Sequence, residues 1–173
     1  MNRTNRSIFH LVMASVLAAL SCAATLVLTI PSPTGGYMNL GDTVVLLGAY
    51  LLGPWWGGAA GAIGSMLADL MAGYALYAPA TLLIKGTMAF LAAFLYRFLG
   101  KRSGAVPLCG FAAESVMVLG YWLYDGLLLG SLTGAAAGLP SNLMQAVFGL
   151  TASTALTLAL KKSPYVRKLF PEF

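Results

Sequence analysis

The chain has 173 residues, of which 59% are hydrophobic and only 9% are charged. Uncharged stretches of about 20 residues recur along it, and this length spans the hydrocarbon core of a bilayer. The composition therefore excludes an ordinary soluble domain and indicates one all-α integral membrane domain over residues 1–173. The net charge of +5 does not indicate nucleic-acid binding, because the basic residues lie at the ends of the apolar stretches instead of along one stripe.

Six transmembrane helices are predicted, and prolines or a glycine-proline pair mark where most of them begin or end. The predicted helices cover about residues 8–30, 41–53, 55–76, 79–99, 106–129 and 139–160. The first apolar run is longer than the core of a secretory signal peptide, so we expect it to be retained. The second helix is only about 20 Å long. It must be extended either by residues 31–40 folding back beside it or by continuation past Pro54.

Lysine and arginine residues lie mostly in the connections on one side of the predicted membrane helices. They cluster before the first helix, between the fourth and fifth helices and after the sixth, with Lys85 left over. The clusters are Arg3 and Arg6; Arg97, Lys101 and Arg102; and Lys161, Lys162, Arg167 and Lys168. The positive-inside rule places these connections in the cytoplasm and predicts an N-in/C-in topology. The outer connections, residues 31–40, 74–79 and 130–140, contain no Lys or Arg, so we expect the outer face to bind something small and not strongly anionic.

Two outer connections carry signals of loop structure. Ser32–Asn39, with the sequence Ser-Pro-Thr-Gly-Gly-Tyr-Met-Asn, is expected to form a structured outer loop. Gly134–Gly138 is expected to be flexible, because glycine adopts backbone conformations that other residues avoid. This second segment fits a lid or a plain linker, and the sequence leaves both interpretations open.

Small residues recur at four-residue spacing on two helices. On the first helix they are Ala14, Ala18 and Cys22, beside Ser15, Ala19 and Ala23; on the third they are Gly57, Gly61 and Ser65. Such a face lets another helix approach closely. Internal packing is the favoured interpretation for the third helix, whereas the stripe on the first helix fits either internal packing or docking of a partner subunit.

Asp69, Lys85 and Glu114 are predicted at membrane depth, where an ionisable residue is costly and therefore suggests a function. Counted along their helices, Asp69 and Lys85 lie at the same level in the outer half of the bilayer, so we expect them to pair. The pair would be a structural salt bridge or would face a ligand pocket. Glu114 lies nearer the middle, where a satisfied structural carboxyl is favoured over a proton carrier.

Aromatic and polar residues gather at the predicted outer ends of the helices. A single interfacial tyrosine is usually a membrane anchor. Tyrosines combined with amides and carboxylates suit a small heteroaromatic ligand, which stacks on the rings and bonds to the polar groups. The candidate ligand-binding residues are Tyr37, Asn39, Asp42, Asp69, Tyr74, Tyr77, Lys85, Trp122 and Asn142. The same predicted region contains Tyr121, Tyr124, Asp125 and Gln145.

No catalytic or metal-binding motif is evident. His10 is the single histidine, no cluster of Cys and His offers metal ligands, and the sequence lacks a Walker A phosphate loop. We therefore expect no catalytic residue, no metal and no cofactor. An intramembrane enzyme with Asp69 and Glu114 as acid and base is disfavoured, because their predicted depths differ by about 9 Å. A stand-alone channel or carrier stays open.

Five motifs together resemble a known family. They are Gly36–Thr43 (Gly-Tyr-Met-Asn-Leu-Gly-Asp-Thr), the Leu-Gly-Pro of residues 52–54 followed by Gly57 and Gly61, the Ala-Asp-Leu of residues 68–70, Tyr77–Thr81 (Tyr-Ala-Pro-Ala-Thr), and the Ile-Lys-Gly of residues 84–86. With these motifs the chain resembles the substrate-binding S components of energy-coupling factor (ECF) transporters, which take up vitamins and their precursors in bacteria. The motifs resemble the riboflavin-type branch as broadly defined, which includes proteins for hydroxymethylpyrimidine or vitamin B6.

The resemblance implies a six-helix bundle that captures a vitamin outside the cell and releases it inside after reorienting in the membrane. It implies a transmembrane coupling (T) subunit and two ATPase subunits as partners, and the bacterial plasma membrane as the location. The T subunit would contact the family's alanine stripe, which corresponds to Ala14 and Ala18 here. The small set of polar groups and the tyrosines fit a single-ring heterocycle, hydroxymethylpyrimidine or a vitamin B6 form, better than three-ring riboflavin.

Overall fold

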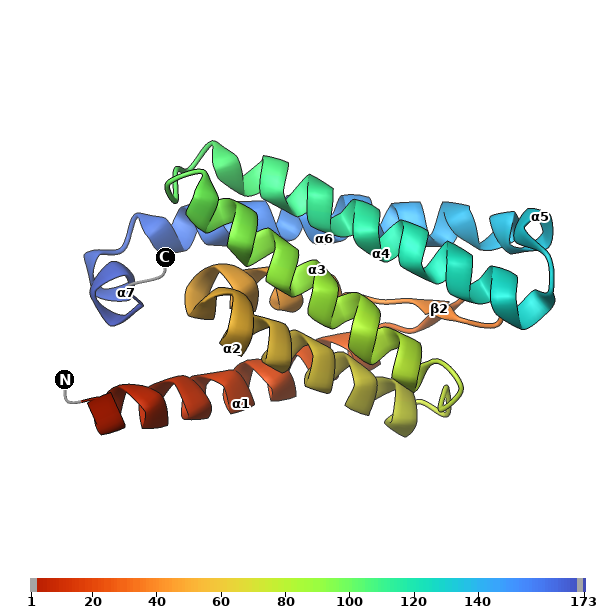
Figure 1. Ribbon diagram of the computed structural model, residues 1–173, viewed down its shortest axis with the longest axis horizontal. Coiled ribbons are helices and arrows are strands. Elements are labelled where there is room, and N and C mark those ends of the chain that lie inside the picture. Colours follow the sequence, from red (N-terminus) through yellow and green to blue (C-terminus); the bar gives the residue numbers. More distant parts are fainter. Residues whose placement is uncertain (1–2, 171–172) are drawn as a thin grey trace.

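The computed structural model describes residues 3–170 and 173, and its long helices run roughly along one axis (Figure 1). The long helices are α1 (Arg3–Val27), α2 (Gly41–Met71), α3 (Ala78–Phe98), α4 (Ala105–Leu129) and α6 (Leu139–Lys161). The shorter elements are the strands β1 (Ile30–Pro31) and β2 (Tyr37–Met38), α5 (Leu132–Ala135), the 3-10 helix η1 (Ala136–Gly138) and α7 (Pro164–Leu169). Within the described residues, five helical segments are long and apolar enough to cross a membrane.

Helix α2 folds back on itself at Gly53. The backbone of Gly53 has φ 80° and ψ −178°, outside the helical region, and a proline follows it. Glycine adopts a positive φ readily. A Cβ atom on Gly57 would lie 2.6 Å from Cα of Ala49. One on Gly61 would lie 2.8 Å from the side chain of Val45. The two halves of α2 therefore pack antiparallel. Because α2 provides two helices, the five long segments give six helices in the bundle, and the predicted six-helix membrane fold is confirmed.

The reversal rules out a straight continuation of the second predicted helix past Pro54. A β1–β2 hairpin instead precedes this short helix, with its two strands paired antiparallel. The turn between the strands is closed by a bond from Ser32 N to Gly36 O at 2.8 Å. Because the first strand occupies these residues, α1 ends at Val27 and not near residue 30.

The connection between α4 and α6 is helical. Ser131 caps α5, where its Oγ accepts a hydrogen bond from Gly134 N at 3.1 Å, and η1 leads directly into α6. Trp122 of α4 donates from its ring nitrogen to Leu132 O at 3.0 Å. Residues 134–138, predicted as a flexible glycine connection, form helical turns that the Ser131 cap and the Trp122 contact support, and their flexibility stays a prediction.

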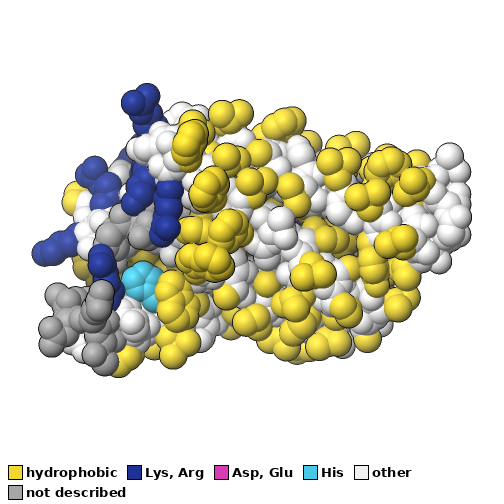
Figure 2. Space-filling model, in the orientation of Figure 1, with side chains coloured by type: hydrophobic (Ala, Val, Ile, Leu, Met, Phe, Trp, Pro, Cys, Tyr) yellow, Lys and Arg dark blue, Asp and Glu magenta, His cyan; other side chains and the backbone are white. Residues whose placement is uncertain are grey.

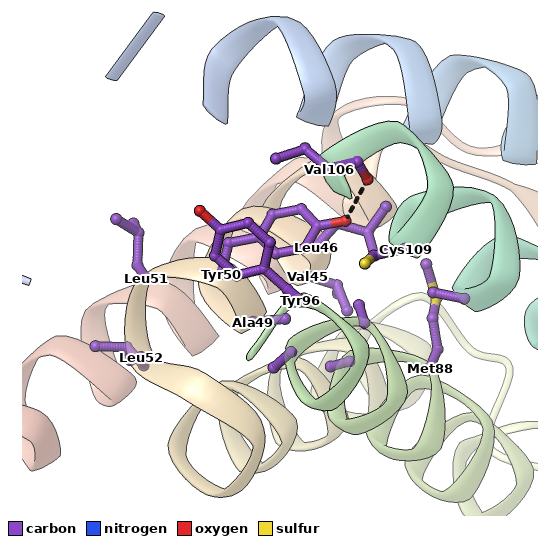
Figure 3. Close-up of a cluster of buried hydrophobic side chains, with 14 of the residues drawn as sticks. Val45, Leu46, Ala49, Tyr50, Leu51, Leu52, Met88, Tyr96, Val106 and Cys109 are labelled. Atoms are coloured by element: carbon purple, nitrogen blue, oxygen red, sulfur yellow. Dashed lines mark hydrogen bonds between the residues drawn. The ribbon is translucent and has the colours of Figure 1, made fainter. Parts of the chain in front are cut away.

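The first half of α2 forms the centre of the hydrophobic core (Figure 3). Leu46 and Tyr50 of this half and Met88 of α3 are at most 1% exposed. Cys109 of α4 packs in the same cluster, and Tyr50 OH donates to Val106 O at 3.1 Å. This half is surrounded by protein instead of lipid, so it can be shorter than a membrane-spanning helix.

Lysine and arginine side chains gather at one end of the molecule (Figure 2). The start of α1, the α3–α4 connection and α7 lie at this end (Figure 1), whereas the rest of the face shown carries mostly apolar side chains. The side chain of Arg3 lies outside the described part of the chain. This separation is what the positive-inside rule requires, and the N-in/C-in orientation stays a prediction.

Candidate ligand-binding site

A small cavity lies where the β1–β2 hairpin meets the ends of α2 and α4 and the starts of α3 and α6. Its volume is about 20 Å³, which is space for about one water molecule. It is lined by Ser32, Thr34, Gly36, Tyr37, Asn39, Asp69, Tyr77, Thr81, Tyr121, Asp125 and Asn142. This lining includes two carboxylates but no Lys or Arg, so the cavity suits a ligand that donates hydrogen bonds.

Each of the two carboxylates accepts a hydrogen bond from a tyrosine. Tyr37 OH donates to Asp69 Oδ1 at 2.6 Å, and Tyr77 OH donates to Asp125 Oδ1 at 2.8 Å. Burial and the neighbouring carboxylates raise the pKa of both tyrosines, so their hydroxyl groups stay protonated and act as donors. Asp69 Oδ2 is buried and accepts no hydrogen bond of good geometry within the described residues, and the side chain of Thr81 lies near this carboxyl group. One strong acceptor is therefore left at the cavity wall.

The tyrosines also hold the hairpin over the cavity. Tyr77 OH lies 3.1 Å from Thr34 O, in the turn of the hairpin. The ring of Tyr37 in β2 packs on Tyr74, with 4.4 Å between the ring centroids. Contacts of this kind hold the hairpin against the cavity, where it covers part of the mouth.

Lys85 pairs with Asp42, so the predicted Asp69–Lys85 pair is wrong. Lys85 and Asp42 are at most 2% exposed, and neither lines the cavity. The cause is the reversal of α2, which places Asp42 at the start of its first half, beside α3. Asp69, near the end of the second half, bonds to Tyr37 instead. Counting residues along a helix gives depth in the bilayer but not the direction in which a neighbour lies.

The buried Asp42–Lys85 pair supports the floor of the cavity through a chain of hydrogen bonds. Gln145 Nε2 donates to Asp42 Oδ2 at 2.7 Å. Asn39 N donates in turn to Gln145 Oε1 at 2.8 Å, and Asn39 directly follows β2. Within residues 3–170 and 173, no group of three or more His, Cys, Asp or Glu side chains could hold a metal ion.

Comparison with known proteins decides the family. Residues 5–162 match the protein family described as "ECF-type riboflavin transporter, S component". The chain belongs to this family. Its fold is similar to a solved structure titled "Structure and mechanism of the S component of a bacterial ECF transporter", with a TM-score of 0.67 and 17% sequence identity. The similarity covers 92% of this chain and 98% of that chain.

Two relatives of this S component are similar over most of their length. A protein of Pyrococcus woesei, described as "Uncharacterized protein in gap 3'region", is 39% identical over 140 residues, which are 80% of this chain and 92% of that protein. The "Thiamine precursor transporter HmpT" of Lactococcus lactis subsp. cremoris is 26% identical over 162 residues, 92% of each chain. As an S component, the chain is a multi-pass membrane protein and the substrate-binding subunit of an ECF vitamin transporter.

The structure separates the candidate residues of the S component into three groups. Five of them line the cavity, namely Tyr37, Asn39, Asp69, Tyr77 and Asn142. Asp42 and Lys85 lie in the supporting pair, and Tyr74 packs behind Tyr37. Trp122 does not line the cavity, and its ring nitrogen bonds to the α5 turn.

The predicted set does not contain several residues that line the cavity, namely Ser32, Thr34, Gly36, Thr81, Tyr121 and Asp125. Helical spacing was the available signal for three of them. Thr81 follows Tyr77 by four residues and Asp125 follows Tyr121 by four, so each pair shares one face of its helix. Thr81 and Tyr121 also share a hydrogen bond of 2.9 Å between their hydroxyl groups. For the hairpin residues the sequence carried no comparable signal.

A groove of about 360 Å³ lies between α1 and the second half of α2 and contains the predicted docking stripe. Ala14 is only 8% exposed and belongs to the core. A Cβ atom on Gly64 would overlap the carbonyl oxygen of Ala18, so α1 and α2 are in close contact there. Ser15 and Ala19 line the same groove and are exposed. They are therefore the small side chains that an approaching helix would meet.

Proposed function

We propose that this S component captures hydroxymethylpyrimidine, or a closely similar amino-substituted single-ring heterocycle, in the cavity beneath the β1–β2 hairpin and releases it inside the cell. The observation that carries the proposal is Asp69 Oδ2, a buried acceptor at the cavity wall that accepts no hydrogen bond of good geometry among the described residues. An amino group on the ligand would donate to it and remove the cost of an unsatisfied buried group. The rings of Tyr37 and Tyr77 offer stacking surfaces at the same place.

The choice among substrates rests on the relatives and on how far the cavity would have to open to admit each ligand. The relative named a thiamine precursor transporter supports a pyrimidine. Riboflavin, which the family description names, is the alternative substrate. Its three fused rings would require a much larger opening of a cavity that now measures about 20 Å³. A vitamin B6 form is a third candidate, and neither relative reported above is named for it.

For transport we propose the partners with which ECF S components work as a family, a T subunit and two ATPase subunits. The S component would bind its substrate outside, reorient within the membrane and release the substrate in the cytoplasm. We propose the bacterial plasma membrane as its location. The alternative is a stand-alone channel or carrier, and substrate uptake into vesicles that contain this chain without any ATPase would select that alternative.

The substitution Asp69→Asn tests the ligand site. Asparagine retains an oxygen that can accept from Tyr37, but it turns the free acceptor at the cavity wall into an amide donor. We expect the affinity for hydroxymethylpyrimidine to fall roughly 10- to 100-fold, because a hydrogen bond to a charged group contributes about 1.5–3 kcal/mol. Isothermal titration calorimetry of the purified chain measures this change.

Glu114→Gln is the matched control, since it exchanges another buried acid for an amide outside the cavity lining. Its affinity for hydroxymethylpyrimidine should equal that of the unsubstituted chain. An unchanged affinity in Asp69→Asn would remove Asp69 from the site. Riboflavin binding by the unsubstituted chain, with no binding of the pyrimidine, would replace the proposed substrate with the alternative.

The substitution Ala19→Leu tests the docking groove on α1. Leucine there would fill the space between α1 and α2 that a helix of the T subunit would use. We expect loss of co-purification with the T subunit and unchanged ligand affinity. Val16→Leu, an exposed position of α1 outside the groove lining, is the control and should co-purify normally. A normal complex with Ala19→Leu would remove this groove from the interface.

A further inference from the structure

A second groove, of about 350 Å³, opens between α4 and α6 on the outside of the bundle. Its walls are mostly apolar, with Phe111, Val118, Leu143 and Val147 among them. Phe111 and Val147 on the rim are each 62% exposed, so in a membrane the groove opens to the hydrocarbon core. Its size falls within the range of small-ligand sites, about 300–1,000 Å³.

Glu114 lies at the floor of this groove. It is only 3% exposed, it lines the groove, and neither of its carboxyl oxygens has a hydrogen-bond partner within residues 3–170 and 173. Gly149 of α6 makes room for it, because a Cβ atom there would overlap Oε1 of Glu114. Ser115 also lines the groove, but its hydroxyl group donates to Phe111 O at 2.9 Å and therefore does not donate to Glu114.

The neighbouring charges leave Glu114 without a counter-ion. A Cβ atom on Gly149 would also lie 2.8 Å from Cβ of Asp42, so the two acidic residues are close neighbours. Lys85 is already paired with Asp42, and Gln145 bonds to the second oxygen of Asp42. A further negative charge at this depth would be costly. The neutral, protonated form of Glu114 avoids this cost, and it would supply both a donor and an acceptor at the base of the groove, where both carboxyl oxygens are buried.

We propose that this groove binds an aliphatic alcohol drawn from the bilayer, with its hydroxyl group on Glu114 and its chain along the apolar walls. A hydroxyl group donates and accepts at once, so it satisfies a carboxylic acid without burying a charge. Glu114 lies nine residues after Ala105, the first residue of α4, which is roughly 13 Å along the helix. A phosphate headgroup at that depth would be far too costly. The ligand is thus a chain headed by a hydroxyl group, and its site does not depend on the substrate proposed above.

Protection of Glu114 from a hydrophobic carbodiimide tests the proposal. The purified chain is placed in phosphatidylcholine nanodiscs, because this lipid has no free hydroxyl group. Dicyclohexylcarbodiimide adds to a protonated carboxylic acid: the carboxyl oxygen bonds to the central carbon, the proton moves to a nitrogen, and no group is lost. We expect mass spectrometry to find Glu114 modified. 1-Decanol should slow the modification about tenfold at ten times its dissociation constant, and n-decane should leave the rate unchanged.

Two variants of α6 test whether 1-decanol protects Glu114 by binding in this groove. Val147→Trp fills the groove from its exposed rim and should both slow the modification and weaken the protection by 1-decanol. Leu156→Trp is the control. Leu156 lies nine residues after Val147, which at about 100° per residue places it on the opposite face of α6. Leu156 is 46% exposed and outside the groove lining, so its variant should behave like the unsubstituted chain.

Four outcomes would overturn the proposal. Absence of modification at Glu114 would mean that the carboxyl group is closed to the bilayer. Equal protection by n-decane and 1-decanol would mean that the ligand binds through its apolar chain alone and that its hydroxyl group makes no bond to Glu114. Stronger protection by decylamine than by 1-decanol would assign a cationic ligand instead of an alcohol. Undiminished protection by 1-decanol in Val147→Trp would place the alcohol elsewhere.

Discussion

Lys85 and Asp42 are a buried pair of opposite charges between α3 and the first half of α2, and each is at most 2% exposed. The formation of such a pair adds little net stability, because both charges lose their hydration. The loss of one partner is costly, since the other is left buried without compensation. The pair therefore acts chiefly as a constraint on how α2 and α3 align beneath the cavity.

The substitution Lys85→Met should lower the free energy of unfolding by roughly 3–5 kcal/mol, because it leaves Asp42 as an unpaired buried charge. Adding Asp42→Asn should restore most of that stability, since the amide is neutral and can still bond to Gln145. Thermal unfolding of the detergent-solubilised variants measures both effects. A single variant as stable as the unsubstituted chain would show that the pair contributes nothing to folding.

At the residue level the sequence identified which side chains are buried and costly, but not which of them meet. Asp69, Lys85 and Glu114 stand out because they interrupt apolar runs, and all three are at most 4% exposed. Asp42 lies at a predicted helix start, where a carboxylate is ordinary, so nothing marked it as the partner of Lys85. Thr34 and Ser32 reach the cavity only through the hairpin, whose two-residue strands are too short to produce a periodic pattern.

At the scale of elements, the reversal of α2 brings both of its ends to the ligand site. Asp42 lies at the start of the first half and Asp69 near the end of the second, and the turn at Gly53 lies between them. The guanidinium group of Arg97 fills the space where a side chain on Gly53 would point. Gly53 thus combines a positive φ with a close neighbour, and the positive φ is what excludes a side chain, because the end of the flexible Arg97 side chain can move.

Three glycine-to-alanine variants measure the cost of a positive φ. Gly73 has a positive φ, and a Cβ atom added there would have no atom within 4 Å. Gly73→Ala should therefore destabilise the chain by about 1–2 kcal/mol through backbone strain alone. Gly53→Ala should cost more, because φ 80° with ψ −178° is a region that only glycine adopts readily, and the overlap with the movable end of Arg97 should add little. Gly104→Ala, at a φ of −67° and with nothing within 4 Å, should change stability by less than about 0.5 kcal/mol. Chemical unfolding compares the three, and equal effects of Gly53→Ala and Gly73→Ala would show that the backbone region of Gly53 adds no cost beyond a positive φ.

Elements with local signals were predictable, and those set by tertiary contacts were not. The Gly53-Pro54 pair combines two residues that interrupt helices, and the chain reverses there. The α5–η1 turns lie in a glycine- and alanine-rich segment, and this composition predicts a flexible connection. The turns are supported by the Ser131 cap and by the Trp122 contact with Leu132, and the second of these exists only once α4 and α5 pack together.

At the scale of the whole molecule, cations at one end and apolar side chains over the rest of the face shown predict which end faces the cytoplasm (Figure 2). Cysteine labelling tests this orientation in a chain with Cys22→Ala and Cys109→Ala. Thr133→Cys, in the α5 turn, should react with a membrane-impermeant maleimide in intact cells. Ser103→Cys, in the α3–α4 connection, should react only after permeabilisation. The reverse pattern would invert the topology and place the cavity on the inside.

The small cavity beneath the hairpin also bears on how fast a ligand can bind. If the proposed heterocycle binds there, the hairpin has to move aside to admit it, because the cavity has space for about one water molecule. Only the fraction of molecules with the hairpin displaced would then be receptive. Association should then be slower than the common range of about 10⁵–10⁷ M⁻¹ s⁻¹. The same movement would also delay escape of the bound ligand and lengthen its residence time, so that the proposed reorientation in the bilayer could be completed before the ligand dissociates.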